Sequence, residues 1–306
     1  MIRNFLFHRV NPERDQLWDP MDVPLFEKCI AYISKKYEVV LIEDLVFSGR
    51  MHEKNHFATI MFDDGYKDNI EFAAPILKKY NCKASFYVVT DAINNNRPTW
   101  THILEYLFQF TSESNIVIDF DFLPAEFRTT HLSSREERIK YVSKLKPYLK
   151  KIDHHLRQQV LDRVEATFND IEIPKLMMNW DDVRALRNAG HYIGSHTVHH
   201  SMLGTIADEQ EVMRELVDSA KCIERELGYF PLTISYPVGS YNATTKRLSA
   251  MAGYQIGLAV KQNVYDPDKD DLFEISRIEL YNEPWWKTRL RISNVLENFK
   301  SIIRYR

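Results

Sequence analysis

Two short polar runs, far apart in the chain, hold the residue types of a mononuclear metal site. The first, Phe-Asp-Asp-Gly-Tyr, places adjacent carboxylates at Asp63 and Asp64, and the second, Gly-Ser-His-Thr-Val-His-His, contains imidazoles at His196 and His200. Histidine nitrogen and carboxylate oxygen are ligands of catalytic zinc sites, which keep one position open for water. A metal ion lowers the pKa of bound water to roughly 7. The runs therefore indicate a hydrolase with Asp64, His196 and His200 as ligands and the neighbouring carboxylate available as a base.

The second run leaves two histidine pairs open. His196 and His200 are spaced i, i+4, so their rings converge if the segment forms a helical turn. His196 and His199 are spaced i, i+3 and satisfy the same condition. Asp-Asp-Gly is also a common turn sequence, because Asp and Gly dominate turns. Either run alone is therefore weak evidence for a metal site.

The elements that must position these runs alternate between strands and helices. Buried strands are predicted directly before the polar runs, at residues 58–62, 191–194 and 232–236. Amphipathic helices are predicted at residues 24–36, 68–80 and 208–227, with Pro75 disturbing the second of them. This alternation is typical of a parallel sheet or barrel. Barrel active sites lie at the carboxyl ends of the strands, where the polar runs would meet.

One segment interrupts the alternation. Residues 94–178 are rich in charge and helical in pattern, and Ser134 with Glu137 forms a predicted capping box. We interpret this segment as a helical insertion within a single domain spanning residues 1–306. An amphipathic helix is predicted at residues 284–304.

The two runs resemble motifs of the polysaccharide deacetylase (NodB-homology, carbohydrate esterase family 4-like) family. Residues 61–65 resemble its T-F-D-D-G motif, with Met61 in place of Thr, and residues 196–200 resemble its H-[ST]-x-x-H motif. The resemblance covers residues 1–95 and 178–280. It implies a distorted (β/α) barrel and hydrolysis of an N-acyl group, acetyl or formyl, on an amino sugar or glycan precursor.

The resemblance also implies roles for particular residues. Asp63 would be the base, and Asp64, His196 and His200 would bind Zn²⁺ or another divalent ion such as Co²⁺, Ni²⁺, Mn²⁺ or Fe²⁺, which leaves His199 beside the site. A third run is similar to the Y-P-x-G-x-Y variant of one branch of the family. Its Val238 backbone N–H is the expected oxyanion donor. The residues expected to contact the substrate are Trp180, Tyr236, Pro237 and Tyr241.

The chain departs from the family pattern in two places. The third run lacks the arginine that holds the base, and Arg277 on the last predicted strand is our candidate for that role, with an ordinary ion pair as the alternative. The family's late histidine, its usual general acid, is absent, because all eleven histidines lie at or before His200. We expect His8, at the end of the first predicted strand, to be the acid, with His199 or a metal-linked water as the alternatives.

Composition narrows the setting of this reaction. The formal net charge of −3 gives no reason to expect nucleic acid as a partner. The three cysteines are scattered, which indicates free buried thiols rather than a disulfide framework. The start of the chain does not resemble a signal peptide, so we expect a cytoplasmic protein. The basic C-terminal helix either packs on the barrel or contacts the inner face of an anionic membrane peripherally.

Three functional hypotheses follow. The first is a metal-dependent sugar N-deacetylase. The second, motivated by the missing late histidine, is a carbohydrate-binding pseudoenzyme that retains the metal. The third is a non-haem iron oxygenase, which uses two histidines and one carboxylate, although the order of the ligands and the alternating elements fit it poorly.

Overall fold

The computed structural model describes residues 1–169 and 171–295, in which eight strands form one sheet. Every pairing within this sheet is parallel. The strands in sheet order are β10 (Ile278–Glu279), β1 (Arg3–Phe7), β3 (Phe57–Phe62), β4 (Ser85–Val88), β7 (Tyr192–Ser195), β8 (Thr233–Ser235) and β9 (Ile256–Leu258), with β2 (Glu38–Val39) also paired to β3.

The sheet curls until its two ends meet. Leu258 of β9 forms a parallel bridge with Ile275, and three residues later Ile278 of β10 pairs with Phe5 of β1. The segment that leads into β10 therefore connects the two edges of the sheet. This arrangement is the distorted (β/α) barrel that the sequence predicts, and it directs the carboxyl ends of the strands to one rim.

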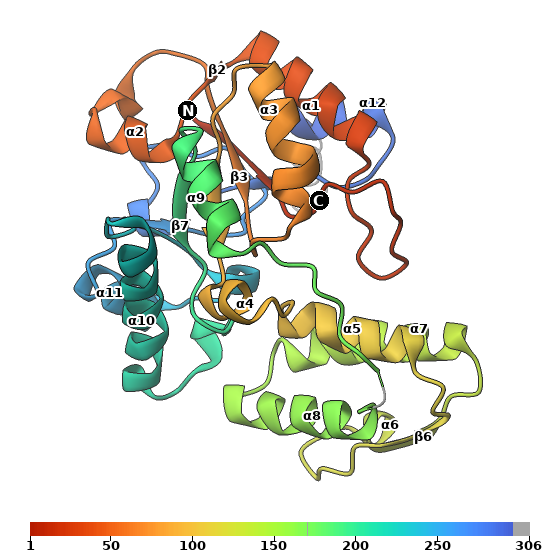
Figure 1. Cartoon of the computed structure of the whole chain (residues 1–306). Helices are drawn as coiled ribbons and strands as arrows, with labels where there is room; N and C mark the ends of the chain where they lie inside the picture. Colours follow the sequence, from red (N-terminus) through yellow and green to blue (C-terminus); the bar gives the residue numbers. More distant parts are fainter. Residues whose placement is uncertain (170, 296–306) are drawn as a thin grey trace, which may run out of the picture.

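Helices cover the outside of the barrel (Figure 1). They are α1 (Val23–Lys36), α2 (Ile42–Phe47), α3 (Ala74–Lys79), α9 (Trp180–Asn188), α10 (Glu209–Leu227), α11 (Ala243–Met251) and α12 (Trp285–Ile292). The helix predicted at 68–80 is in two parts: a π-helical turn, Asn69–Ala73, precedes α3, which has Pro75 in its first turn. Proline has no backbone N–H, so it fits the start of a helix and disrupts its interior.

The predicted insertion forms a separate lobe below the barrel in Figure 1. Its helices and strands are α5 (Trp100–Phe110), β5 (Asn115–Val117), α6 (Ala125–Arg128), β6 (Thr129–His131), α7 (Arg135–Leu149) and α8 (His154–Thr167). The preceding helix, α4 (Thr90–Asn95), lies against α10 of the barrel. The antiparallel pair β5–β6 was not predicted from the sequence. The Ser134–Glu137 capping box starts α7 as predicted. Side chains from α5, α7 and α8 form a hydrophobic core that is distinct from the barrel core.

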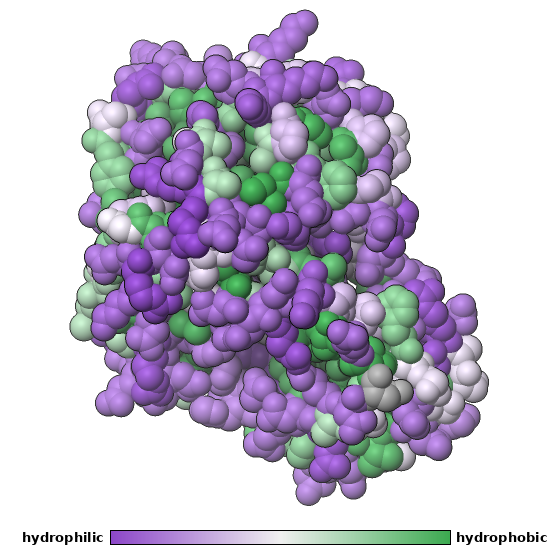
Figure 2. All heavy atoms as spheres, viewed as in Figure 1, coloured by the Kyte–Doolittle hydropathy of each residue, from purple (hydrophilic) through white to green (hydrophobic). Residues whose placement is uncertain are grey.

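The predicted C-terminal helix lies only partly within the described residues. Helix α12 spans Trp285–Ile292, and residues 296–304 of the predicted range lie outside the described residues. The Trp285 ring of α12 lies edge-on to Tyr32 of α1, with ring centroids 5.7 Å apart, so this helix packs on the barrel. Among the described residues, no helix combines the length and apolar character needed to cross a bilayer. Hydrophilic residues cover most of the face shown in Figure 2. All three cysteines are free and buried, as predicted.

Candidate active site

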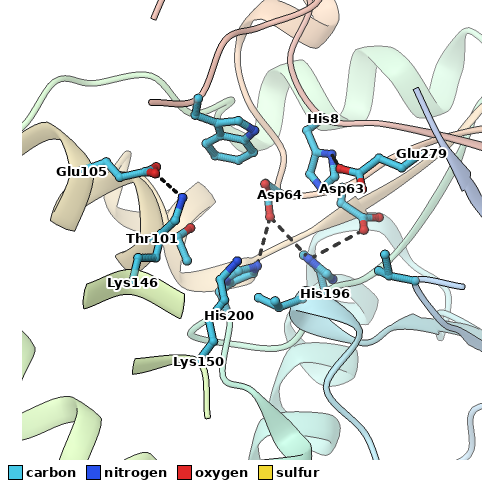
Figure 3. A pocket seen from close by; sticks show the side chains of 13 residues that line it. His8, Asp63, Asp64, Thr101, Glu105, Lys146, Lys150, His196, His200 and Glu279 are labelled. Atoms are coloured by element: carbon cyan, nitrogen blue, oxygen red, sulfur yellow. Dashed lines mark hydrogen bonds and ion pairs between the residues drawn. The ribbon is translucent and has the colours of Figure 1, made fainter. Parts of the chain in front are cut away.

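Three buried side chains converge at the carboxyl ends of β3 and β7. Asp64 follows β3, whereas His196 and His200 follow β7. Ligand atoms from these three residues lie within 4.8 Å of one another. The Oδ1 atom of Asp64 is 3.4 Å from Nε2 of His196 and 3.3 Å from Nε2 of His200 (Figure 3). The structure thus brings together the three residues predicted as metal ligands.

The spacing of these atoms fits a metal ion better than it fits hydrogen bonds. Ligands about 2.0–2.2 Å from a tetrahedral ion lie roughly 3.3–3.6 Å from each other, as observed here. His196 places Nδ1 2.8 Å from the Ser235 carbonyl, which fixes the ring and leaves Nε2 directed at the carboxylate. Among the described residues, no hydrogen-bond partner reaches Asp64 Oδ1. A divalent cation would satisfy all of these atoms.

The electrostatics of the site also favour a positive charge at this point. Burial lowers the pKa of His196, but the Asp63 and Asp64 carboxylates outweigh it and raise the pKa overall. Burial lowers the pKa of His200 to about 3, so this ring is neutral and able to bind a metal. Burial opposes ionisation of Asp64, yet His196 and His200 keep its pKa below the usual range.

Unusual backbone conformations coincide with the site. Apart from glycine and asparagine, the described residues with positive φ are Asp64 (75°), Thr197 (67°), His200 (58°) and Val238 (58°). The histidine run therefore turns through left-handed residues at Thr197 and His200, and the expected helical turn is wrong. A β-branched residue at positive φ is strained, and strain of this kind is concentrated at functional sites.

Asp63 lies beside the three ligands without joining them. Its Oδ1 accepts a hydrogen bond of 2.9 Å from Arg277, and its Oδ2 accepts one of 3.1 Å from Ser235. Burial raises the pKa of Asp63, but Arg277 and His196 outweigh it and lower the pKa below its usual value. Arg277 has no exposed surface and also donates to the Ala259 carbonyl. The structure thus places Arg277 where the sequence predicted it, holding an ionised Asp63.

A pocket of about 180 Å³ opens over these residues. Its wall includes the predicted Asp63, Asp64, His196, His200, Val238 and His8. His8 follows β1, and its Nδ1 lies 3.5 Å from Oε1 of Glu279 on β10. The Glu279 carboxylate can therefore hold the imidazole in its place in the pocket wall. The His8 ring also lies edge-on to Trp18, with ring centroids 5.6 Å apart.

His199 faces away from this pocket. Its ring Nδ1 is 2.6 Å from Glu215 of α10, and 63% of its side chain is exposed. The same carboxylate accepts the backbone N–H groups of Val198 and His199, which shapes the loop that carries His200. His199 is therefore neither a ligand nor a plausible acid, and of the two histidine candidates for the acid only His8 lies in the pocket.

None of the four residues predicted to contact the substrate lines this pocket. Tyr236 and Pro237 are buried, and the Tyr236 ring packs in a hydrophobic cluster beneath the rim. Tyr241 stacks on Tyr236 at a centroid distance of 5.0 Å. Trp180, the first residue of α9, donates its indole N–H to the Asn94 side chain. Only the Val238 part of that run reaches the pocket.

Sequence reasoning missed most of the pocket's opposite wall. Thr101 and Glu105 of α5, Lys146 of α7 and the adjoining Lys150 come from the insertion and face the metal ligands (Figure 3). Lys146 and Glu105 form an ion pair. These residues carry no local motif. Glu279 was also missed, although its place at the end of the last strand was a usable signal.

Comparison with known proteins identifies the family of the chain. The model of the family described as "Polysaccharide deacetylase" matches residues 51–257. The chain belongs to the polysaccharide deacetylase family. A curated relative from Bacillus subtilis (strain 168), named "Putative polysaccharide deacetylase YxkH", is 21% identical over 221 residues, which span 72% of this chain and 50% of that protein. The chain therefore matches half the length of that relative.

Solved structures show the same fold. The Streptococcus pyogenes deacetylase PplD, solved in complex with acetate, aligns with a TM-score of 0.61 at 17% identity, covering 97% of this chain and 96% of PplD. A de-N-acetylase from Aggregatibacter actinomycetemcomitans aligns with a TM-score of 0.62 at 15% identity, covering 95% and 99% of the two chains.

Proposed function

We propose that this deacetylase is a metal-dependent hydrolase that removes an N-acyl group, acetyl or formyl, from an amino sugar in a glycan or glycan precursor. The observation that carries the proposal is the pairing of a metal-type ligand set with a separate carboxylate. Asp64, His196 and His200 converge within 4.8 Å, while Asp63 is held apart by Arg277 and Ser235. A ligand set alone would support metal binding, and the tethered base adds the means of activating water.

The residues divide the reaction between them. When bound to Asp64, His196 and His200, Zn²⁺ or a similar ion would supply Lewis-acid chemistry, lowering the pKa of water and polarising the amide carbonyl. Asp63, kept ionised by Arg277, accepts the proton of the attacking water. The Val238 backbone lies in the pocket wall, where its N–H can donate to the oxyanion.

The leaving amine needs a proton, and His8 is placed to provide it. His8 lies in the pocket wall beside Glu279, on a different strand from the base. This pair supports turnover over the binding-only alternative, because the pocket holds a candidate acid despite the absence of a late histidine. An acid and a base from different strands can act on the two sides of one scissile bond.

The first test is the Asp63→Asn variant assayed for acetate or formate release from N-acetylated and N-formylated amino sugars with added Zn²⁺ or Co²⁺. We expect the substitution to lower kcat/KM about 10²- to 10⁴-fold, as is typical for loss of general acid–base catalysis, while bound metal per chain stays unchanged. Asp121→Asn is the matched control, because the Asp121 side chain is fully exposed. A metal-loaded wild type that is inert on the whole panel would contradict the proposal.

A further inference from the structure

Lys150 is an unmatched cation in the wall of the catalytic pocket. It follows the last turn of α7, half-buried, and Figure 3 shows its side chain extending toward His200. Two other charges of the wall have ion-pair partners: Asp63 pairs with Arg277, and Lys146 pairs with Glu105. Among the described residues, no side chain forms an ion pair or hydrogen bond with the Lys150 amine.

The charges around the Lys150 amine indicate what kind of substrate group it can bind. Asp64 is the one ligand carboxylate, so it offsets half the charge of a divalent ion. The Glu105, Glu279 and Asp64 carboxylates attract the Lys150 ammonium, but none of them forms an ion pair with it. A bound divalent ion would repel this ammonium, and an anion that enters the pocket beside it would offset the repulsion. Burial and the Lys146 ammonium already lower the pKa of Lys150 from its usual value. A substrate anion beside the amine would relieve both effects, because an opposite charge stabilises the ammonium form.

We propose that Lys150 binds an anionic oxygen of the substrate, so that the preferred substrate is an acidic N-acylated glycan with a phosphate or carboxylate on the reacting sugar or its neighbour. The inference rests on the proposed function, whose substrate class it narrows. The small pocket places this acidic group close to the reacting amide, since only about 180 Å³ is available. Lysine acts here as a point charge, which suits either phosphate or carboxylate oxygen.

Matched sugar pairs test the inference and separate the two anions. N-acetylglucosamine 1-phosphate is compared with methyl N-acetylglucosaminide, and N-acetylmuramic acid with N-acetylglucosamine. Lys150→Met is compared with wild type and with Lys151→Met, which removes an exposed charge at the next position. Dissociation constants come from calorimetry on the Zn²⁺-loaded protein, and kcat/KM comes from acetate release.

We expect wild type to bind at least one acidic sugar more tightly than its neutral counterpart. Lys150→Met should weaken acidic binding about 10- to 150-fold, the range for charged hydrogen bonds, with neutral binding unchanged. Lys150→Arg should restore part of the preference, and Lys151→Met should retain it. The sugar pair that loses its affinity difference in Lys150→Met shows whether the amine binds phosphate or carboxylate.

Two results would overturn the inference. One is that the wild type binds the acidic and neutral sugars with equal affinity. Failure to bind either kind of sugar measurably would count as the same result. The other is an equal loss of kcat/KM on acidic and neutral sugars in Lys150→Met, because that would place the amine in the reaction itself. Turnover of neutral sugars without an acidic preference would refute this inference and leave the proposed deacetylase activity intact.

Discussion

Replacing Arg277 with methionine tests the claim that this residue exists to hold the base. Arg277 is completely buried, and its guanidinium donates to Asp63 at 2.9 Å and to the Ala259 carbonyl at 3.0 Å. Methionine keeps much of the side-chain volume but removes the charge and both donors. The Asp63 carboxylate, 2% exposed, then loses its strongest cationic partner.

The expected magnitude follows from burial. Removing one partner of a buried ion pair costs about 3–5 kcal/mol, because the remaining charge stays desolvated and unpaired. The same change at an exposed pair costs about 0–1 kcal/mol. Arg50 is the matched control, since it pairs with Glu38 and Glu53 while its side chain is 38% exposed. Arg277→Met should therefore destabilise the protein several times more than Arg50→Met.

Urea unfolding of the metal-loaded protein measures both changes. The double variant Asp63→Asn, Arg277→Met should be more stable than Arg277→Met alone, because no unpaired carboxylate then remains buried. The reasoning is refuted if Arg277→Met costs no more than Arg50→Met. It is also refuted if the double variant is as unstable as the sum of the two single variants, because the residues would then be energetically independent.

Two further predictions concern histidines with different tasks. His191 is buried, its Nδ1 accepts the Ala84 backbone N–H, and burial with the nearby Lys83 lowers its pKa to about 4. The unfolded chain takes up this proton near pH 6.5 and the folded chain only near 4, so stability should fall on acidification across that window by at most about 3 kcal/mol. His191→Gln should flatten the unfolding free energy between pH 7 and 4 in chelator, and an unchanged slope would contradict this. His8→Gln should lower kcat about 10²-fold or more with metal content unchanged, whereas exposed His131→Gln should leave kcat intact; near-wild-type turnover in His8→Gln would remove His8 from the mechanism.

The sequence was sufficient for the side of the site that the barrel rim carries. Asp63 and Asp64 follow one buried strand and His196 another, and parallel strands place their carboxyl ends on one rim. Arg277 on the last predicted strand was predicted for the same reason, because the closed sheet brings β10 beside β1. In these cases strand periodicity and topology together determine the neighbours.

Other features depend on local geometry that residue types do not encode. The histidine spacing suggested a helical turn, yet the chain reaches the same convergence through positive φ at Thr197 and His200. Tyr236 was expected at the substrate because its run resembles a family motif, but its ring fills the core below the rim. A motif specifies which backbone segment lines a site, and packing decides which of its side chains are exposed to the pocket.

The part of the site that the sequence predicted least well is the wall formed by the insertion. On α7, Tyr141, Val142, Leu145 and Leu149 are buried in the insertion's own core, while Lys146 and Lys150, one turn apart, face the catalytic pocket. The helical period thus predicts that the two lysines share a face, but not what that face meets. The residues that they face across the pocket, Asp64 and His200, belong to the barrel rim. The packing of the insertion core against the barrel core therefore determines the position of the Lys150 amine relative to the metal ligands. In the function proposed above, the barrel rim supplies the chemistry and the insertion, through Lys150, selects the glycan.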